Sequence, residues 1–423
     1  MRFAFCILKL TTEGRNMLDI NFIRQNRELV KQGAKNKGVK VDIEKLLRVD
    51  DERKRLLQEV ENLRSQINKT SQSKPTQAEI EKLKIIKEKI KNIEPSLEAI
   101  AKEFDSLMRQ VPNPPAKDAP VGKNENDNQV LRKWGKPTKF DFVVRNHIEL
   151  GKINDVIDTI RATKVSGARF YYLKGLAVEI EMALIRFAIR WLKEKGFTPI
   201  IPPHLISEKA MSGMGYLDHG GDQEIYHLTK DNLYLIGTSE QPIGAMHTNE
   251  IIDEKKLPLK YVGFSPCYRR EAGSYGKDTA GILRSHQFDK IEMFVFCAPE
   301  ESEKEHQKLL GIEEEIMREL ELPYQVVNIC AGDLGDPVVK KYDIEAWIPS
   351  QQKYRETHST SNTTDYQARR LNIRIRRKNG KIEILHMLNG TAIAIGRTLI
   401  AIMENYQTKD GKIKIPEALK KYL

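Results

Sequence analysis

Residues 266–296 read PCYRREAGSYGKDTAGILRSHQFDKIEMFVF, and this stretch predicts two strands joined by a glycine-bearing loop. Arg269 and Glu271, before the loop, are two residues apart, so they share one face of an extended strand. Residues 282–296, after the loop, are rich in Ile, Phe, Val and Met, as buried strands are. Three residues of this second segment have the same parity and are expected on one face unless a bulge intervenes: Arg284, Phe288 and Glu292.

An antiparallel pair of these strands would place two arginines, two glutamates and an aromatic ring together. Unpaired buried charge is costly, so such a face is not an ordinary core face. One interpretation is a surface hairpin with salt bridges. The other is a nucleotide site, in which arginines bind phosphate bidentately, a ring stacks on a base, and a glutamate holds an ammonium or amino group. Residue types alone leave both interpretations open.

The composition of the chain is typical of a basic protein of about two domains. It has 423 residues and a net charge of +11, and the excess fits a polyanionic partner, although basic proteins without one are common. The cysteines are far apart, which argues against a disulfide framework or a cysteine zinc cluster and predicts a cytoplasmic protein. No apolar run approaches the roughly 18 residues of a membrane span, so no membrane partner is expected. The four cysteines are Cys6, Cys267, Cys297 and Cys330.

Two long helices with a narrow apolar seam are predicted near the N-terminus. Apolar residues recur in steps of three and four, a spacing typical of a coiled coil. The segment TSQSKPT between them contains Pro75, so the chain most simply folds back as an antiparallel hairpin that projects as an arm. Pro95, inside the second helix, is expected to kink it or remove a backbone bond. The seam residues are Leu46, Val49, Leu56, Val60, Leu63 and Ile67, with Arg53 in the same series, and then Leu83, Ile86, Ile90, Ile93, Leu97, Ile100, Phe104, Leu107 and Val111.

The tip of this hairpin is basic, and a proline-rich segment follows its second helix. Residues 64–91 carry eight Lys or Arg against three Asp or Glu, which fits either a solvated helical face or a phosphate-binding surface. The segment VPNPPAKDAPVG breaks both flanking patterns, and residues 112–122 are therefore interpreted as a linker. Residues 302–320 are expected to form a charged surface helix without site chemistry.

Residues 270–293, REAGSYGKDTAGILRSHQFDKIEM, resemble motif 2 of the class II aminoacyl-tRNA synthetases, and in particular that of the seryl-tRNA synthetase family. A helix expected over residues 174–195, followed by the strand and prolines of FTPIIPP, is similar to motif 1. IEILHMLNGTAIAIGRTLIAIMENYQ, interpreted as strand, glycine turn and helix, is similar to motif 3. Residues 329–370 also resemble the family, and Met17 falls at its usual N-terminus.

This resemblance implies an α+β fold and an enzymatic function. An antiparallel sheet flanked by helices would occupy residues 123–423, and a tRNA-binding coiled-coil arm would occupy residues 17–111, with residues 1–16 as an extension. The implied activity is that of an ATP-dependent serine–tRNA ligase, which makes seryl-adenylate from L-serine and transfers serine to tRNA(Ser). The resemblance further implies Mg²⁺, a homodimer formed through motif 1, and tRNA(Sec) as a second candidate substrate.

The resemblance also assigns residues to ATP and magnesium. Arg269 would hold the α-phosphate and Arg397 the γ-phosphate, so both are implied as catalytic residues, while Phe288 would stack on adenine. Glu356 and Ser359 would hold magnesium, an ion that prefers oxygen ligands. The other implied ATP ligands are Glu271, Arg284, Thr357 and His358, in addition to Glu356 and Ser359.

A serine pocket is implied by NLYLIGTSEQPI, in which Thr238 and Glu240 are expected on one face of a strand end, although the tripeptide TSE is as often the start of a helix. Glu292 would bind the serine ammonium. The family more often has proline at position 237 and serine at position 391, so Gly237 and Thr391 depart from its pattern. The implied serine-binding residues are Thr238, Ser239, Glu240, Glu292, Asn389 and Thr391.

Two other functions are considered for such a sequence. An enzyme of this fold that loads an amino acid onto a carrier protein would lack the basic N-terminal arm. A non-catalytic RNA-binding paralogue is expected to have lost at least one of the four charged site residues, and all four are present: Arg269, Glu271, Glu292 and Arg397. The scattered cysteines do not suggest the ligands of a zinc-dependent seryl-tRNA synthetase.

Overall fold

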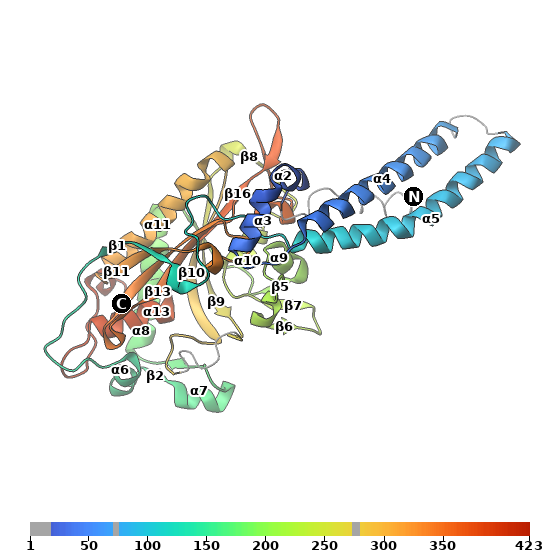
Figure 1. Ribbon diagram of the computed structural model, residues 1–423. Coiled ribbons are helices and arrows are strands. Elements are labelled where there is room, and N and C mark those ends of the chain that lie inside the picture. Colours follow the sequence, from blue (N-terminus) through green and yellow to red (C-terminus); the bar gives the residue numbers. More distant parts are fainter. Residues whose placement is uncertain (1–17, 71–75, 273–279) are drawn as a thin grey trace. The chain divides into compact units, whose positions relative to one another are not determined.

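The computed structural model describes residues 18–70, 76–272 and 280–423, and the chain divides into two compact units, Met1–Pro112 and Asn113–Leu423 (Figure 1). The expected extension at residues 1–16, residues 71–75 between the two long helices and residues 273–279 of the motif 2 loop lie outside the described residues.

The N-terminal unit contains an antiparallel pair of long helices, which confirms the predicted coiled coil. Ion pairs join Lys45 to Glu103 at 2.8 Å and Arg64 to Glu94 at 3.3 Å, so the two helices run in opposite directions. Their buried seam consists of Leu56, Val60, Ile86, Ile90 and Leu97. The helices of this unit within residues 18–70 and 76–112 are α2 (Ile20–Gln25), α3 (Arg27–Asn36), α4 (Ile43–Thr70) and α5 (Gln77–Arg109).

The local sequence explains where the second long helix begins and how it continues. Thr76 and Glu79 form a capping box, in which each side chain accepts from the other residue's backbone N–H. Helix α5 then continues through Pro95 to Arg109. In α4, the buried Asp50 is surrounded by the cations of Arg24, Arg53 and Lys54. Burial alone would raise the pKa of Asp50, but hydrogen bonds from these cations outweigh burial and lower it.

An eight-stranded sheet forms the centre of the second unit, in the order β1-β11-β12-β13-β16-β10-β9-β4. Neighbouring strands are antiparallel except β4, which pairs parallel with β9. The expected antiparallel sheet with flanking helices is therefore confirmed. The strands are β1 (Gln129–Trp134), β4 (Thr198–Ile200), β9 (Leu259–Tyr268), β10 (Gln287–Cys297), β11 (Tyr324–Asn328), β12 (Lys340–Ile348), β13 (Lys353–Asn362) and β16 (His386–Ala394).

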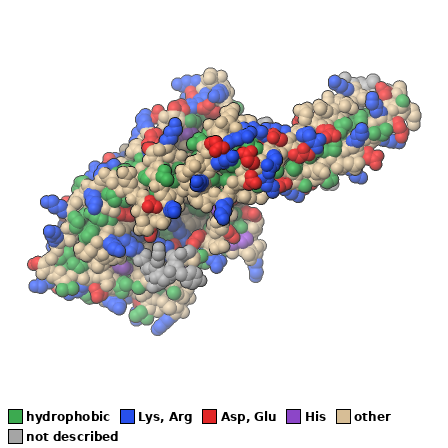
Figure 2. Space-filling model, in the orientation of Figure 1, with side chains coloured by type: hydrophobic (Ala, Val, Ile, Leu, Met, Phe, Trp, Pro, Cys, Tyr) green, Lys and Arg blue, Asp and Glu red, His purple; other side chains and the backbone are tan. Residues whose placement is uncertain are grey.

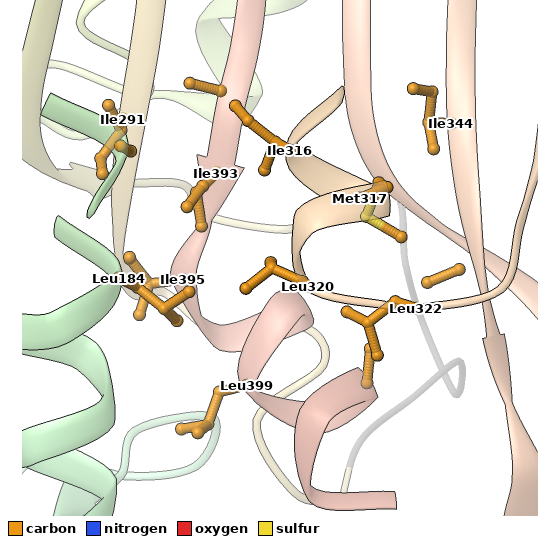
Figure 3. Packing of buried hydrophobic residues seen from close by; sticks show 14 of the residues in the cluster. Leu184, Ile291, Ile316, Met317, Leu320, Leu322, Ile344, Ile393, Ile395 and Leu399 are labelled. Atoms are coloured by element: carbon orange, nitrogen blue, oxygen red, sulfur yellow. The ribbon is translucent and has the colours of Figure 1, made fainter. Parts of the chain in front are cut away.

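Three helices cover one face of this sheet: α8 (Leu176–Glu194), α11 (Ser302–Glu319) and α13 (Ile395–Asn405). Figure 3 shows Leu184 of α8, Ile316 of α11 and Leu399 of α13 in the same hydrophobic core as Ile393 of β16. Helix α11 was expected on the surface, and this is wrong for its inner side, which is buried. That side even includes Glu313, whose pKa is raised far above its usual value by burial.

Shorter elements surround the main sheet. Near one end of its second face, Phe294, Phe296 and Met387 pack with α12, β8 and β14 in a separate core. The other α-helices of this unit, among its described residues, are α6 (His147–Ile153), α7 (Thr159–Ser166), α9 (Glu208–Gly213), α10 (Glu240–Ala245), α12 (Tyr366–Leu371) and α14 (Glu417–Lys420). The small sheets are β2 (Ile157–Asp158) with β3 (Tyr172–Leu173); β5 (Leu205–Ser207) with β7 (Leu233–Leu235) and β6 (His227–Leu228); and β8 (Ile251–Asp253) with β14 (Arg374–Arg376) and β15 (Ile382–Ile384).

Several predicted element boundaries need correction. Strand β10 begins at Gln287, so Arg284 precedes it, and β9 ends at Tyr268, just before Arg269. The glycine turn expected in motif 3 is absent, because β16 continues through Gly390 and leads directly into α13. Among the helices of the described residues, none is both long and apolar enough to cross a membrane.

Candidate active site

A cavity of about 740 Å³ lies in the second unit and is lined by side chains from both sides of the motif 2 loop. Strand β10 pairs with β9 without a bulge, so Phe288, Lys290 and Glu292 face this cavity, while Ile291, Met293 and Val295 pack under the covering helices. The predicted site residues that line the cavity are Thr238, Glu240, Arg269, Glu271, Arg284, Phe288, Glu292, Glu356, Thr357, Ser359, Asn389, Thr391 and Arg397.

Glu292 is almost completely buried at the floor of this cavity. Its Oε2 lies 2.5 Å from Lys290 Nζ and accepts a hydrogen bond from Thr391 Oγ1 at 3.3 Å. Thr391 reaches it because β16 carries a bulge at Ala392, which sets Thr391 opposite Glu292. Burial raises the pKa of Glu292, although Lys290 opposes this effect. The result is a buried carboxylate that already has one cation beside it.

A second bulge explains how Glu356 and Ser359 share the cavity. On a regular strand, residues three apart face opposite sides of the sheet. Here Thr357 is an extra residue in the pairing of β13 with β12, and this bulge turns Glu356 and Ser359 to the same side. Arg397 Nη1 lies 3.0 Å from Glu356 Oε1 and donates to the Glu356 carbonyl at 3.1 Å. The cavity environment alone would raise the pKa of Glu356, but the cations of Arg397, Lys341 and Arg269 lower it to about 2. Glu356 is therefore an anion at any physiological pH.

The end of β9 supplies the groups predicted to meet ATP. The Arg269 guanidinium lies over the Phe288 ring, 5.3 Å from its centroid, and Arg269 Nε donates to the Gly237 carbonyl at 3.1 Å. Glu271 accepts from Arg284 at 3.0 Å across the loop. The expected strand alternation of Arg269 and Glu271 is wrong, because Glu271 has a left-handed backbone with φ of 51°. Both residues line the cavity nevertheless.

The TSE segment does not continue a strand as the sequence suggested. Strand β7 ends at Leu235, and Glu240 is the first residue of helix α10. Thr238 and Glu240 still meet in the cavity, because the Glu240 backbone N–H donates to Thr238 Oγ1 at 3.2 Å in a tight turn.

Two predicted residues lie outside the cavity lining, and others in the lining were not predicted. Ser239 is buried and bonds to the Ser265 hydroxyl, while His358 is buried beside the Thr357 hydroxyl. The cavity also includes Tyr216, Lys290, Lys341 and Gln367. Only Lys290 had a sequence signal, since it has the parity of Phe288 and Glu292.

Glu356 and Ser359 can hold a magnesium ion only if the nucleotide and water supply most of its ligands. In the described part of the chain, no group of three or more His, Cys, Asp or Glu side chains could hold a metal. The carboxylate of Glu356 and the hydroxyl of Ser359 both line the cavity, and their oxygens are of the kind that Mg²⁺ prefers when phosphates and water complete its shell.

Comparisons with known proteins connect this geometry with a family. Residues 17–115 match the seryl-tRNA synthetase N-terminal domain, and residues 225–406 match the tRNA synthetase class II core domain (G, H, P, S and T). The chain is 46% identical to the serine–tRNA ligase of Dictyoglomus turgidum, over 96% of this chain and 98% of that protein. The chain belongs to the seryl-tRNA synthetase family. The predicted family is thereby confirmed.

Solved structures of seryl-tRNA synthetases have the same fold. The crystal structure of the Pyrococcus horikoshii enzyme complexed with ATP matches with a TM-score of 0.89 and 43% identity, over 96% of this chain and 98% of that one. The cytoplasmic serine–tRNA ligase of Naegleria fowleri in complex with AMP matches with a TM-score of 0.85 and 35% identity, over 96% of each chain. The predicted class II fold is confirmed by both matches.

Proposed function

We infer that this chain is a serine–tRNA ligase, which joins L-serine to ATP as seryl-adenylate with release of pyrophosphate and then transfers serine to tRNA. The observation that carries this function is the convergence of Arg269 and Glu292, from the motif 2 region, with Arg397, from motif 3, on one cavity in a chain of the seryl-tRNA synthetase family. Its relatives are named serine–tRNA ligases, and one of them was crystallised with ATP.

The first step needs positioning and charge stabilisation rather than a general base. The serine carboxylate is already an anion at neutral pH, and it attacks the α-phosphorus while negative charge develops on the phosphoryl oxygens. Arg269 would hold the α-phosphate. Arg284 and Arg397 would exchange their present partners, Glu271 and Glu356, for the outer phosphates. The adenine would stack on the face of Phe288 opposite Arg269, with its amino group at Glu271.

Magnesium would be held by Glu356 and Ser359 at the phosphate end of the cavity. When bound, the ion would neutralise phosphate charge and fix the bend of the triphosphate. The Glu356 carboxylate suits this role because its pKa of about 2 keeps it charged, and because Arg397 can release it when phosphates arrive.

The serine end of the cavity would be built from two carboxylates and several hydroxyl and amide groups. Glu292 would hold the ammonium, while Thr238, Glu240, Asn389 and Thr391 line the remainder. Polar groups that pair with the serine hydroxyl are left unsatisfied by alanine, a penalty that can reach several orders of magnitude. Threonine would be excluded by lack of room for its extra methyl group.

The N-terminal unit would bind tRNA(Ser). Its helices present interspersed basic and acidic side chains on the face shown in Figure 2, and Lys or Arg exceed Asp or Glu in residues 64–91. The proposal that tRNA(Sec) is also charged rests on the family resemblance alone. Aminoacylation assays with tRNA(Ser) and tRNA(Sec) in parallel test which of the two tRNAs receives serine.

A homodimer is proposed from an exposed apolar strip on the second unit. Val178 and Met182 lie one turn apart on α8 and are 38% and 47% exposed, and Ile201 after β4 is 81% exposed. This helix and strand correspond to motif 1.

The buried free thiols of Cys267, Cys297 and Cys330 suit a reducing cytoplasm, where we place the enzyme.

ATP–pyrophosphate exchange measured with each of the twenty amino acids tests this function. Exchange should depend on serine, and a protein that exchanges with another amino acid would contradict the assignment. Because the chain divides at Pro112, a variant lacking residues 18–112 should retain serine-dependent exchange and lose tRNA charging. Full charging without the N-terminal unit would refute its role in tRNA binding.

A further inference from the structure

Glu240 is held by two neutral hydrogen-bond donors from distant parts of the sequence. Tyr216 Oη donates to Glu240 Oε2 at 2.8 Å, and Gln367 Nε2 donates to Oε1 at 3.0 Å. Only 7% of Glu240 is exposed, yet within residues 18–70, 76–272 and 280–423 no Lys or Arg forms an ion pair with it. Glu292, in contrast, has Lys290 beside it. The two carboxylates of the serine pocket are therefore held in different ways.

Gln367 is itself fixed from both ends of its amide. Its Nε2 also donates to the Met214 carbonyl at 3.1 Å, and its Oε1 accepts from Thr363 Oγ1 at 3.1 Å. The same Thr363 hydroxyl lies 2.8 Å from the Met387 carbonyl of β16, so its single proton is shared between the two acceptors. Gln367 and Thr363 are both buried. A continuous chain of hydrogen bonds thus connects the backbone of the central sheet to the carboxylate of Glu240.

This arrangement fixes the plane of the Glu240 carboxylate without neutralising it. A carboxylate has about four acceptor positions, and the two donors occupy one on each oxygen. Glu240 lines the cavity, so acceptor capacity remains for a ligand there. A buried carboxylate without a cation gains strongly from an ammonium or hydroxyl donor, because charge interactions are stronger away from water. The Glu240 carboxylate can bind a substrate group with a defined geometry only if neighbouring residues fix its orientation.

We propose that Gln367 and Tyr216 are positioning residues, which orient the Glu240 carboxylate to accept hydrogen bonds from the polar end of the amino acid substrate. The inference rests on the proposed function, because it takes serine as the ligand of this pocket. It assigns a role to helix α12 and to the segment after α9, neither of which carries a residue expected to touch ATP.

The Gln367→Met variant removes the amide with little change in size and tests this role. We expect its KM for serine to rise at least about tenfold, the effect of losing a hydrogen bond to a charged group. Its KM for ATP should stay within about twofold of wild type, because the proposed phosphate and adenine contacts are made by other residues. Tyr216→Phe removes the other donor and should change serine KM in the same direction, which keeps the test decisive if one variant fails to fold.

A matched control is Gln407→Leu. Gln407 is also buried and bonds to the backbone of Arg145 and Glu404, but it lies outside the cavity lining. This variant should lower the melting temperature and leave the serine KM unchanged. If Gln367→Met and Gln407→Leu both lower stability and neither changes the serine KM, the positioning role is overturned.

The Gln367→Glu variant gives a readout that a purely structural role would not. It places a second carboxyl against Glu240, and two close carboxylates cannot both stay charged. Relative to wild type, serine-dependent exchange of this variant should therefore be weakest at high pH and recover as the pH is lowered, because the introduced carboxyl can donate a hydrogen bond only when it is protonated. A pH profile parallel to that of wild type would contradict the proposal. If wild type does not exchange with serine, the proposed function fails, and the same variants are compared with whichever amino acid does exchange.

Discussion

Glu292→Ala should reduce serine-dependent ATP–pyrophosphate exchange at least about a hundredfold, because truncating one partner of a buried, hydrogen-bonded charge pair between protein and ligand costs about 2–5 kcal/mol of binding free energy. The change removes the carboxylate proposed to meet the substrate ammonium. It also leaves the Lys290 ammonium buried without its partner and the Thr391 hydroxyl without its acceptor. Exchange rates at saturating ATP and increasing serine measure the loss. Near-normal exchange would refute the role assigned to Glu292.

Two further variants separate charge from structure in this prediction. Glu314→Ala removes a buried carboxylate on helix α11, outside the cavity, that pairs with the half-exposed Arg132, so it should lower stability and spare exchange. Glu292→Gln keeps the shape and removes the charge. Because burial raises the pKa of Glu292, wild-type activity should fall as the pH decreases through that pKa, when the carboxylate is protonated and cannot pair with an ammonium. This decline should be absent in Glu292→Gln.

Arg269→Ala should lower the maximal exchange rate about 100- to 1,000-fold, the range for removing one donor that stabilises transition-state charge. Arg269 is the guanidinium proposed at the α-phosphate, and its position is fixed by the Gly237 carbonyl and the Phe288 ring. The effect should appear in the rate more than in serine KM, since serine is held by other groups. Exchange kinetics with each substrate varied in turn provide the measurement.

The neighbouring arginine supplies the control for this second prediction. Arg270 is exposed and does not line the cavity, so Arg270→Ala should keep exchange within about twofold of wild type. Equal losses in the two variants would show that positive charge near the loop matters rather than the specific position of Arg269.

The family, the fold class and most of the cavity could be predicted from the sequence. The coiled-coil seam could be predicted because apolar residues that recur every three or four positions lie on one side of a helix, and that side is the buried one. The long resemblance over motif 2 identifies its residues, although the strand alternation predicted for Arg269 and Glu271 is wrong. Those two residues lie beyond the end of β9, where the chain turns with a left-handed residue at Glu271.

The remaining geometry depends on contacts that no local pattern reports. Glu356 and Ser359 share one side only because Thr357 is a bulge, and a bulge is set by the partner strand. Gln367 lies on a short helix whose sequence resembles any amphipathic turn. Its role is visible only when the fold brings it within 3.0 Å of Glu240, 127 residues earlier in the chain. Side chains that act through a second residue are hard to find from sequence for this reason.

A crystal structure with L-serine and a nonhydrolysable ATP analogue tests most directly whether guanidiniums from separate motifs converge on one triphosphate. The expected result is adenine against Phe288, the α-phosphate at Arg269, the γ-phosphate at Arg397, and the serine ammonium at Glu292. A nucleotide bound elsewhere, or one in this cavity whose phosphates contact neither arginine, would contradict the proposed active site.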